Sequence, residues 1–388
     1  MIEASVVKPT TRVQFLGAEY RILWAVGLLL GFGMIMTVNL AYHSNTEALD
    51  KSYFIALLKF FASAIIGLGL MYAQRWLSSK AIFAFASILL LVSLALLIYT
   101  WQHGVIVHGA RRWIDIFGFR FQPVELFKPV LAVSLASILC LNELGYKSRI
   151  AILVTQLIFV IITGASLVLI FLQPNHSAVV ICLMAIFFLA LLSNSIKWKY
   201  ICGIMFVVII ATAVMLLGSE EKRERIEAWI FGKNSDDISL KAERYQVELA
   251  LKAIAAGGWT GQGLGRSVVK YSLPASSTDF VFAIIIEEFG FIGGTVLLLC
   301  YLYLILQALS VSAREEDQFM KLAGVGVTLF LILNVMVHVA VKLDLAPTTG
   351  IPLPFLSQGG SALIFHLASI GIILNIARRQ DQINGCKF

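Results

Sequence analysis

The chain has 388 residues, of which 59% are hydrophobic and 14% are charged, and its mean hydropathy is +0.87. These values exclude an ordinary soluble globular protein and are typical of a polytopic membrane protein. The formal net charge of +7 does not indicate a nucleic-acid partner, because the Lys and Arg residues lie mainly in short segments between apolar stretches. The five cysteines occur singly, without the spacing of a metal site, so we expect no metal bound by them.

Ten apolar stretches are long enough to cross a bilayer. In chain order they cover residues 21–42, 53–73, 81–101, 126–142, 150–172, 178–193, 199–217, 280–310, 321–343 and 361–377. The sequence therefore predicts an all-α integral membrane protein of about ten transmembrane helices, with a large extracytoplasmic loop (218–279) between helices 7 and 8. We expect one membrane domain over 21–377 and two cytoplasmic tails, 1–20 and 378–388.

The distribution of Lys and Arg predicts the orientation of these helices. With a cytoplasmic N-terminus, fourteen of these residues fall in the tails and inner loops, and five fall in the short outer loops. Positive charge collects on the cytoplasmic side, so we expect both termini to be inside, together with the loops at 74–80, 143–149 and 194–198. The loops expected outside are 102–125, 218–279 and 344–360.

The first polar outer region runs from Gly109 to Lys128. Arg111 and the neighbouring Arg112 are suited either to binding a phosphate or to contacting lipid headgroups. Glu125 and Lys128, three residues apart, share one face of a helix. Two alternatives stay open for them: an ion pair that anchors the helix end, or a pair that lines a polar cavity.

The long outer loop changes character along its length. Its first half, 220–242, is charged and predicts a solvated helix that lies on the membrane surface. The second half carries Gln246, five glycines between Gly257 and Gly265, and then Lys270. Such a glycine-rich run permits close backbone approach to a ligand or a tightly folded turn, and flexible turns are the commoner case.

Asp279 ends this loop and directly precedes the eighth apolar stretch. At the boundary between water and lipid, its carboxylate is suited to capping the helix by accepting backbone N–H bonds, which is the usual function of Asp there. The alternative is that it acts as a general base beside an apolar wall, facing a sugar hydroxyl. The residue types alone favour the cap.

Glu287 and Glu288 lie about two turns deeper, within an otherwise apolar stretch. An ionised side chain is costly at that depth, so at least one of them is expected to face a cavity or a polar partner. The candidate partners on other helices are Lys342, Lys59 and Asn334.

The third polar outer region, 347–361, contains three prolines and three glycines with Leu and Phe between them. This composition excludes a regular helix and is too apolar for a solvated turn. We therefore expect a structured re-entrant loop that packs on protein and ends at Ser361.

Four motifs together resemble one family, the shape, elongation, division and sporulation (SEDS) proteins, which are lipid-linked cell-wall polymerases of bacteria. In chain order the motifs are GARRW with QPxExxK, YQ with GGWxGxGLG, LPxxxTDFxFAxxxEExGFxG, and PTTGxPLPFxSxGGS. The resemblance implies that Asp279 is the catalytic residue, in place of the cap. It also implies a cavity lined by Glu125 and Lys128 and bordered by Arg111, Gln246, Lys270 and Ser361.

The segment GLGRSVVK resembles the division enzymes of the family more than the elongation enzymes. The resemblance thus implies a peptidoglycan glycosyltransferase that polymerises lipid II at the division septum, in the bacterial inner membrane. It implies a class B penicillin-binding transpeptidase and other division proteins of the membrane as partners. No tightly bound cofactor is expected; a divalent cation, Mg²⁺ or Mn²⁺, is an option on the substrate pyrophosphate.

Three alternatives stay open. An elongation enzyme would carry out the same chemistry. A lipid II flippase would need polar groups near the membrane midplane and a path to both faces, whereas the polar motifs here cluster on the outer side. A division scaffold that recruits a transpeptidase is compatible with an enzymatic role.

Overall fold

The computed structural model describes residues 17–42, 51–107, 109–142, 145, 147–193, 203, 206, 210, 226–231, 238–272 and 278–383. Its helices are α1 (Ala18–Tyr42), α2 (Lys51–Gln74), α3 (Ser79–His103), α4 (Pro123–Leu139), α5 (Arg149–Leu172), α6 (His176–Leu192), α9 (Ile238–Gly257), α10 (Val281–Ala313), α11 (Gln318–Lys342) and α12 (Gly360–Ile383). The other described elements are a single-turn 3-10 helix, η1 (Val269–Tyr271), and three short strands: β1 (Val105–Val107), β2 (Ala110–Ile116) and β3 (Phe119–Phe121).

Among the described residues, seven helices are long and apolar enough to cross a membrane: α1, α2, α3, α5, α10, α11 and α12. Helix α6 is apolar but shorter. The predicted helical, multi-span membrane fold is therefore confirmed. Helix α4 begins at Pro123, three residues before the predicted span, because proline fits the first turn of a helix. The predicted span 199–217 lies outside the described residues, apart from three single positions.

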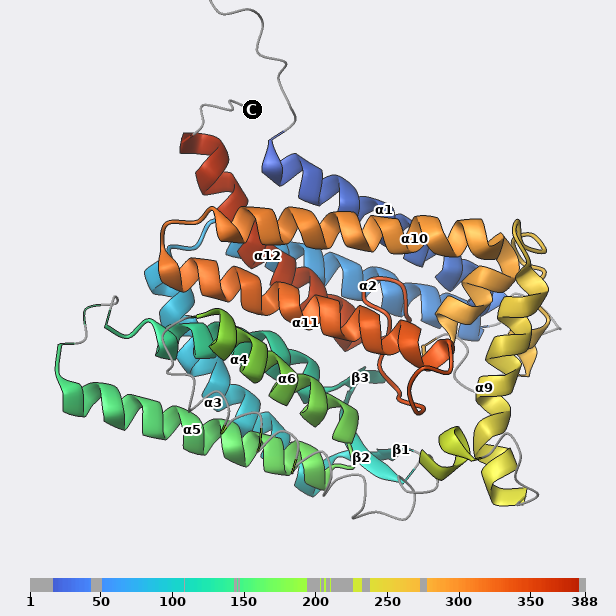
Figure 1. Ribbon diagram of the computed structural model, residues 1–388, viewed down its shortest axis with the longest axis horizontal. Coiled ribbons are helices and arrows are strands. Elements are labelled where there is room, and N and C mark those ends of the chain that lie inside the picture. Colours follow the sequence, from blue (N-terminus) through green and yellow to red (C-terminus); the bar gives the residue numbers. More distant parts are fainter. Residues whose placement is uncertain are drawn as a thin grey trace, which may run out of the picture.

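The long helices run side by side, while α9 crosses their ends and the strands lie at the same end as α9 (Figure 1). The start of α1 and the end of α12 meet at the opposite end. There, the Asp381 carboxylate accepts hydrogen bonds from the backbone N–H groups of Ala18 and Glu19, at 3.1 and 3.0 Å. The bundle thus has one end that carries both described chain ends and another that carries the irregular segments.

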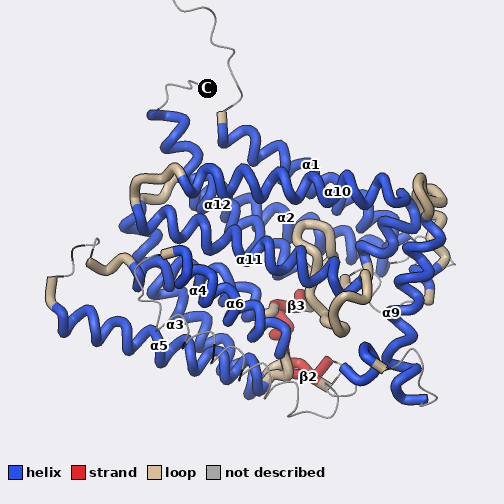
Figure 2. The backbone as a smooth tube through the Cα atoms, in the orientation of Figure 1, coloured by secondary structure: helices blue, strands red, loops and turns tan. Residues whose placement is uncertain are grey.

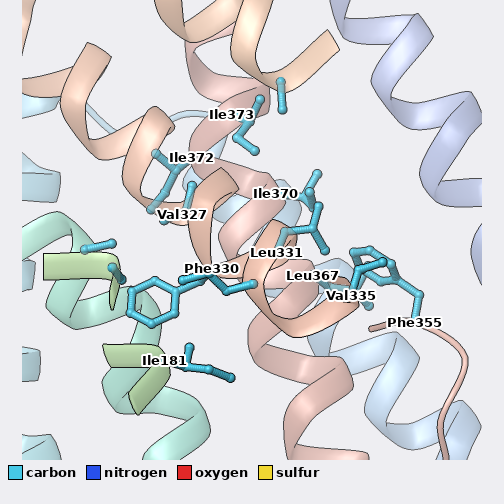
Figure 3. Close-up of a cluster of buried hydrophobic side chains, with 14 of the residues drawn as sticks. Ile181, Val327, Phe330, Leu331, Val335, Phe355, Leu367, Ile370, Ile372 and Ile373 are labelled. Atoms are coloured by element: carbon cyan, nitrogen blue, oxygen red, sulfur yellow. The ribbon is translucent and has the colours of Figure 1, made fainter. Parts of the chain in front are cut away.

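Helix α12 is the centre of the bundle. Of its most apolar 18 residues, 78% are buried, against 17% for α5, whose exposed leucines and isoleucines are suited to contact lipid. Figure 3 shows Ile370 and Ile373 of α12 packed among Leu331 of α11 and Phe355 of the loop before α12. The predicted re-entrant loop therefore does pack on protein.

The small antiparallel sheet, with strand order β1-β2-β3, was not predicted. It lies in the segment 102–125 and appears as the red segments in Figure 2. Gly118 has a φ of +80° in the turn between β2 and β3, and its N–H donates to Asp115 Oδ1 at 2.7 Å. Two of the three strands have only three residues, which is too short for alternation to be recognised in the sequence.

Helix α10 is interrupted at Gly290, where φ is 70° and ψ is −173°. The glycine-rich turn after α9 docks against this break. The N–H groups of Gln262 and Gly263 donate to the carbonyls of Glu287 and Glu288, each at 2.9 Å. The glycines therefore allow the backbone of the turn to approach the backbone of α10 closely. Of the two predicted alternatives, a ligand-binding backbone and a tightly folded turn, the structure supports the turn.

Candidate active site

Asp279 directly precedes α10, beside the loop before α12 and near the end of α11. The residue is partly buried, and the helix cap is the next residue, Phe280, which makes no side-chain capping bond. The predicted alternative of Asp279 as the N-cap is therefore wrong, because the chain enters the helix one residue later than the apolar pattern indicates.

The loop 347–361 fixes the backbone beside Asp279. Ser357 Oγ donates to the Thr278 carbonyl at 2.7 Å and accepts from the Leu353 N–H at 2.8 Å. Gly350 faces the acid directly: a Cβ added to it would lie 3.4 Å from Asp279 Oδ2. The loop and the acid are therefore in direct contact.

Two buried side chains hold this loop from below. The Tyr301 hydroxyl of α10 donates to the Pro354 carbonyl, and His338 Nδ1 of α11 lies 2.7 Å from the Ile351 carbonyl. Phe355 packs against the His366 ring of α12, with centroids 6.0 Å apart. Phe355 thus connects the loop to His366, which lines the cavity of the second polar group, Glu125 and Lys128.

This second group is the buried ion pair of α4. Lys128 Nζ donates to Glu125 Oε1 at 2.7 Å, and the two residues are 3% and 4% exposed. They line a cavity of about 20 Å³, with Asn334 of α11 and His366 of α12 opposite, which is room for about one water molecule. Asn334 Oδ1 and His366 Nε2 are buried without a hydrogen-bond partner among the described protein atoms. Both alternatives for Glu125 and Lys128 therefore hold, since the ion pair also lines a cavity.

The other predicted site residues differ in position. Ser361 Oγ accepts from the Gln122 N–H at 3.3 Å, which joins the start of α12 to the start of α4, close to Glu125. Arg111 is exposed on β2 and donates to the Gln102 carbonyl at 3.1 Å. Gln246 is partly buried on α9. Within the described residues, Arg111 and Gln246 share no hydrogen bond with the α4 pair.

Lys270 is buried in an internal network. Its ammonium donates to Asn39 Oδ1 at 3.1 Å and to the Gly265 carbonyl at 2.9 Å, and lies 3.4 Å from Glu288 Oε1. The residue is 6% exposed. Its predicted part in substrate binding stays a prediction; the contacts present join the glycine-rich turn to α1 and α10.

The predicted partners of Glu287 and Glu288 are wrong. Glu288 interacts with Lys270 and Asn39, while Glu287 accepts from the Ser267 hydroxyl and from the Val268 N–H, the latter at 3.0 Å. The glycine-rich turn brings these groups to α10 when it docks on the helix break. Lys342, Lys59 and Asn334 take no part in that network as described.

Sequence reasoning missed the position of Lys342. Its ammonium lies 3.7 Å from the ring centroid of Phe280, the residue that follows Asp279. The spacing of Asn334, His338 and Lys342, at four-residue intervals on α11, is a signal visible in the sequence, because such positions share one helix face.

No metal site is formed by the residues that the structure describes: no group of three His, Cys, Asp or Glu side chains is close enough to hold an ion. The expected divalent cation on the substrate pyrophosphate stays a prediction.

Fold and site together define a multi-pass membrane protein with a partly buried carboxylate and a buried ion pair near one end of its helix bundle. The sequence family described as "Cell cycle protein" (FtsW/RodA/SpoVE) matches residues 20–382. The chain belongs to this family, and the resemblance to the SEDS proteins is confirmed.

Similar proteins and structures agree with this assignment. A probable peptidoglycan glycosyltransferase FtsW of Synechocystis sp. is 32% identical over 72% of this chain and 68% of its own. Its counterpart in Geobacter sp. is 29% identical over 94% and 97%. A structure described as a peptidoglycan synthase complex that coordinates polymerization and crosslinking has a TM-score of 0.72 at 26% identity, over 94% and 98%. The crystal structure of Thermus thermophilus RodA has a TM-score of 0.64 at 23% identity, over 92% and 96%, and supports the fold.

Proposed function

We propose that this protein is a peptidoglycan glycosyltransferase that polymerises lipid II into glycan strands during septal wall synthesis in cell division. The observation that carries the proposal is the position of Asp279, a partly buried carboxylate that directly precedes the helix cap Phe280 and faces the tightly packed loop 347–361. The relatives named above as probable FtsW enzymes support the reaction and favour division over elongation.

The reaction needs one proton acceptor. The 4-hydroxyl oxygen of the acceptor sugar forms a bond to the anomeric carbon of the donor, and the bond from that carbon to the lipid pyrophosphate breaks. Asp279 takes the hydroxyl proton as this bond forms. The electron pair of the broken bond leaves with undecaprenyl pyrophosphate.

The leaving pyrophosphate needs positive charge. Arg111 is the exposed candidate, because its guanidinium projects from the outer sheet and is able to bind phosphate oxygens bidentately. Lys128 is already paired with Glu125. For Lys128 to stabilise the pyrophosphate, the ion pair must open, or both residues must contact the substrate together. Gln246, Lys270 and Ser361 are proposed to border the bound substrate.

The proposed partner is a class B penicillin-binding transpeptidase, together with other division proteins of the bacterial inner membrane. Support comes from the similar structure described as a peptidoglycan synthase complex. We propose that both termini are cytoplasmic and that the end of the bundle carrying α9 and the strands faces outward, where lipid II is polymerised.

Polymerisation in detergent micelles tests this function against a flippase. The purified protein, alone and with its transpeptidase, is mixed with labelled lipid II, and glycan strands are separated by size. Micelles have no two sides, so lipid translocation cannot produce a polymer. Strand formation supports the enzyme. Absence of strands, with lipid II translocation by the same preparation in vesicles, contradicts it; absence of both leaves the scaffold function.

A further inference from the structure

Helix α11 carries a buried polar row that reaches Asp279. Asn334, His338 and Lys342 occupy successive positions four residues apart and are 1%, 1% and 2% exposed. Four-residue spacing places them on one face of the helix. Polar groups within a membrane-crossing helix are costly unless they face a partner or a cavity, so each member of the row requires an explanation.

Two members have structural partners. Asn334 donates to the Phe330 carbonyl at 2.8 Å and lines the cavity of Glu125 and Lys128. His338 Nδ1 contacts the Ile351 carbonyl of the loop that packs on Asp279. Lys342 is the outermost member and lies closest to the acid.

Lys342 places an ammonium group in a buried position. Its ammonium lies 3.7 Å from the ring centroid of Phe280, the residue that follows Asp279. An aromatic face stabilises a cation, and more strongly where water is excluded. A ring alone does not neutralise the charge, and buried charges are kept only where an opposite charge compensates them.

The other charged side chains that the structure describes near the end of α11 pair with one another. They are Arg244 and Glu248 on α9 and Asp344 after α11, with His338 below as a further titratable group. Arg244 Nη2 lies 2.7 Å from Asp344 Oδ2, and Arg244 Nε lies 3.4 Å from Glu248 Oε1. Asp279 directly precedes Phe280, the ring on which the Lys342 ammonium lies, so its carboxylate is close enough for its charge to act on Lys342.

We infer that Lys342 is the counter-ion of Asp279: a positioning residue that keeps the carboxylate ionised at the membrane boundary and ready to accept a proton. The charge pairing itself does not depend on the proposed function, whereas its effect on catalysis rests on it. Lys342 is too deeply buried in this structure to be a first contact for a lipid pyrophosphate.

Labelling by dicyclohexylcarbodiimide tests the pairing without any catalytic readout. This apolar reagent modifies protonated carboxyl groups, so the labelling of Asp279, followed by mass spectrometry against pH, reports its ionisation. In Lys342→Met and Lys342→Gln, the midpoint of Asp279 labelling should move to higher pH by about one unit or more, a tenfold change in the protonated fraction. Lys342→Arg should retain the wild-type midpoint.

Lys128→Met is the matched control, because it removes the partner of Glu125 and should move the labelling of Glu125 but not that of Asp279. An unchanged Asp279 midpoint in either neutral Lys342 variant overturns the inference, as does an equal shift in Lys342→Arg.

If the enzyme polymerises lipid II, the acid limb of its pH–rate profile should move in the same direction in Lys342→Gln. A raised KM with an unmoved acid limb would assign Lys342 to pyrophosphate binding instead. A wild type that forms no strands counts against the proposed function and leaves the labelling result standing.

Discussion

Glu125 and Lys128 form an ion pair within the helix bundle, at a place where neither charge is stable alone. Removing one partner leaves the other uncompensated, which typically costs about 3–5 kcal/mol. We therefore expect Lys128→Met to lower the free energy of unfolding by roughly that amount. The double variant Glu125→Gln/Lys128→Met should recover much of the loss, because neither residue is then charged.

Denaturant unfolding of the purified protein in detergent compares the three proteins. Recovery of stability without recovery of polymerisation would separate the structural contribution of the pair from a part in substrate binding. If the double variant is as unstable as Lys128→Met, the buried charge is not the cause of the instability.

At the level of elements, the glycine-rich turn docks against the break at Gly290 in α10, the helix that directly follows Asp279. A Cβ on Gly261 would lie 2.2 Å from the Glu288 carbonyl oxygen. Gly258 also has a positive φ, but a Cβ there meets nothing within 4 Å. Both alanine variants strain the backbone by about 1 kcal/mol, and only Gly261→Ala adds a clash.

We expect Gly261→Ala to be less stable than Gly258→Ala by about 1–3 kcal/mol, the usual cost of overpacking. Thermal unfolding of both variants under the same conditions measures the difference. Equal stabilities of Gly261→Ala and Gly258→Ala would show that the turn does not pack against α10 as closely as the structure indicates.

The sequence predicts these elements unevenly. Hydropathy and length locate the membrane-crossing helices, because each is a long apolar run. They do not locate the break in α10, since Gly290 stands in an apolar run that reads as continuous helix, and its left-handed backbone depends on the docked turn. The motifs identify Asp279 and the Glu125–Lys128 pair, whereas the positions of Lys270 and Lys342 depend on which segments meet in three dimensions.

For the whole molecule, the testable property is its orientation in the membrane. The distribution of Lys and Arg predicts that the sheet lies outside and the turn between α2 and α3 inside. In a cysteine-free background, Phe117→Cys in the fully exposed β2–β3 turn should react with a membrane-impermeant thiol reagent added to intact spheroplasts. Lys80→Cys, near the start of α3, should react only after the membrane is opened. The reverse pattern would invert the proposed topology and place Asp279 on the cytoplasmic side.

The central claim is that Asp279 accepts the proton during glycan polymerisation, and its direct test is the rate of strand formation from labelled lipid II by Asp279→Asn. Asp115→Asn is the matched control, because Asp115 is an exposed acid at the same end of the bundle, and its Oδ1 remains an acceptor in the variant. With both variants folded and bound to the transpeptidase, Asp279→Asn should lose at least about 100-fold in rate, as expected for a general base, and Asp115→Asn should match the wild type. Equal rates for Asp279→Asn and the wild type would contradict the assignment.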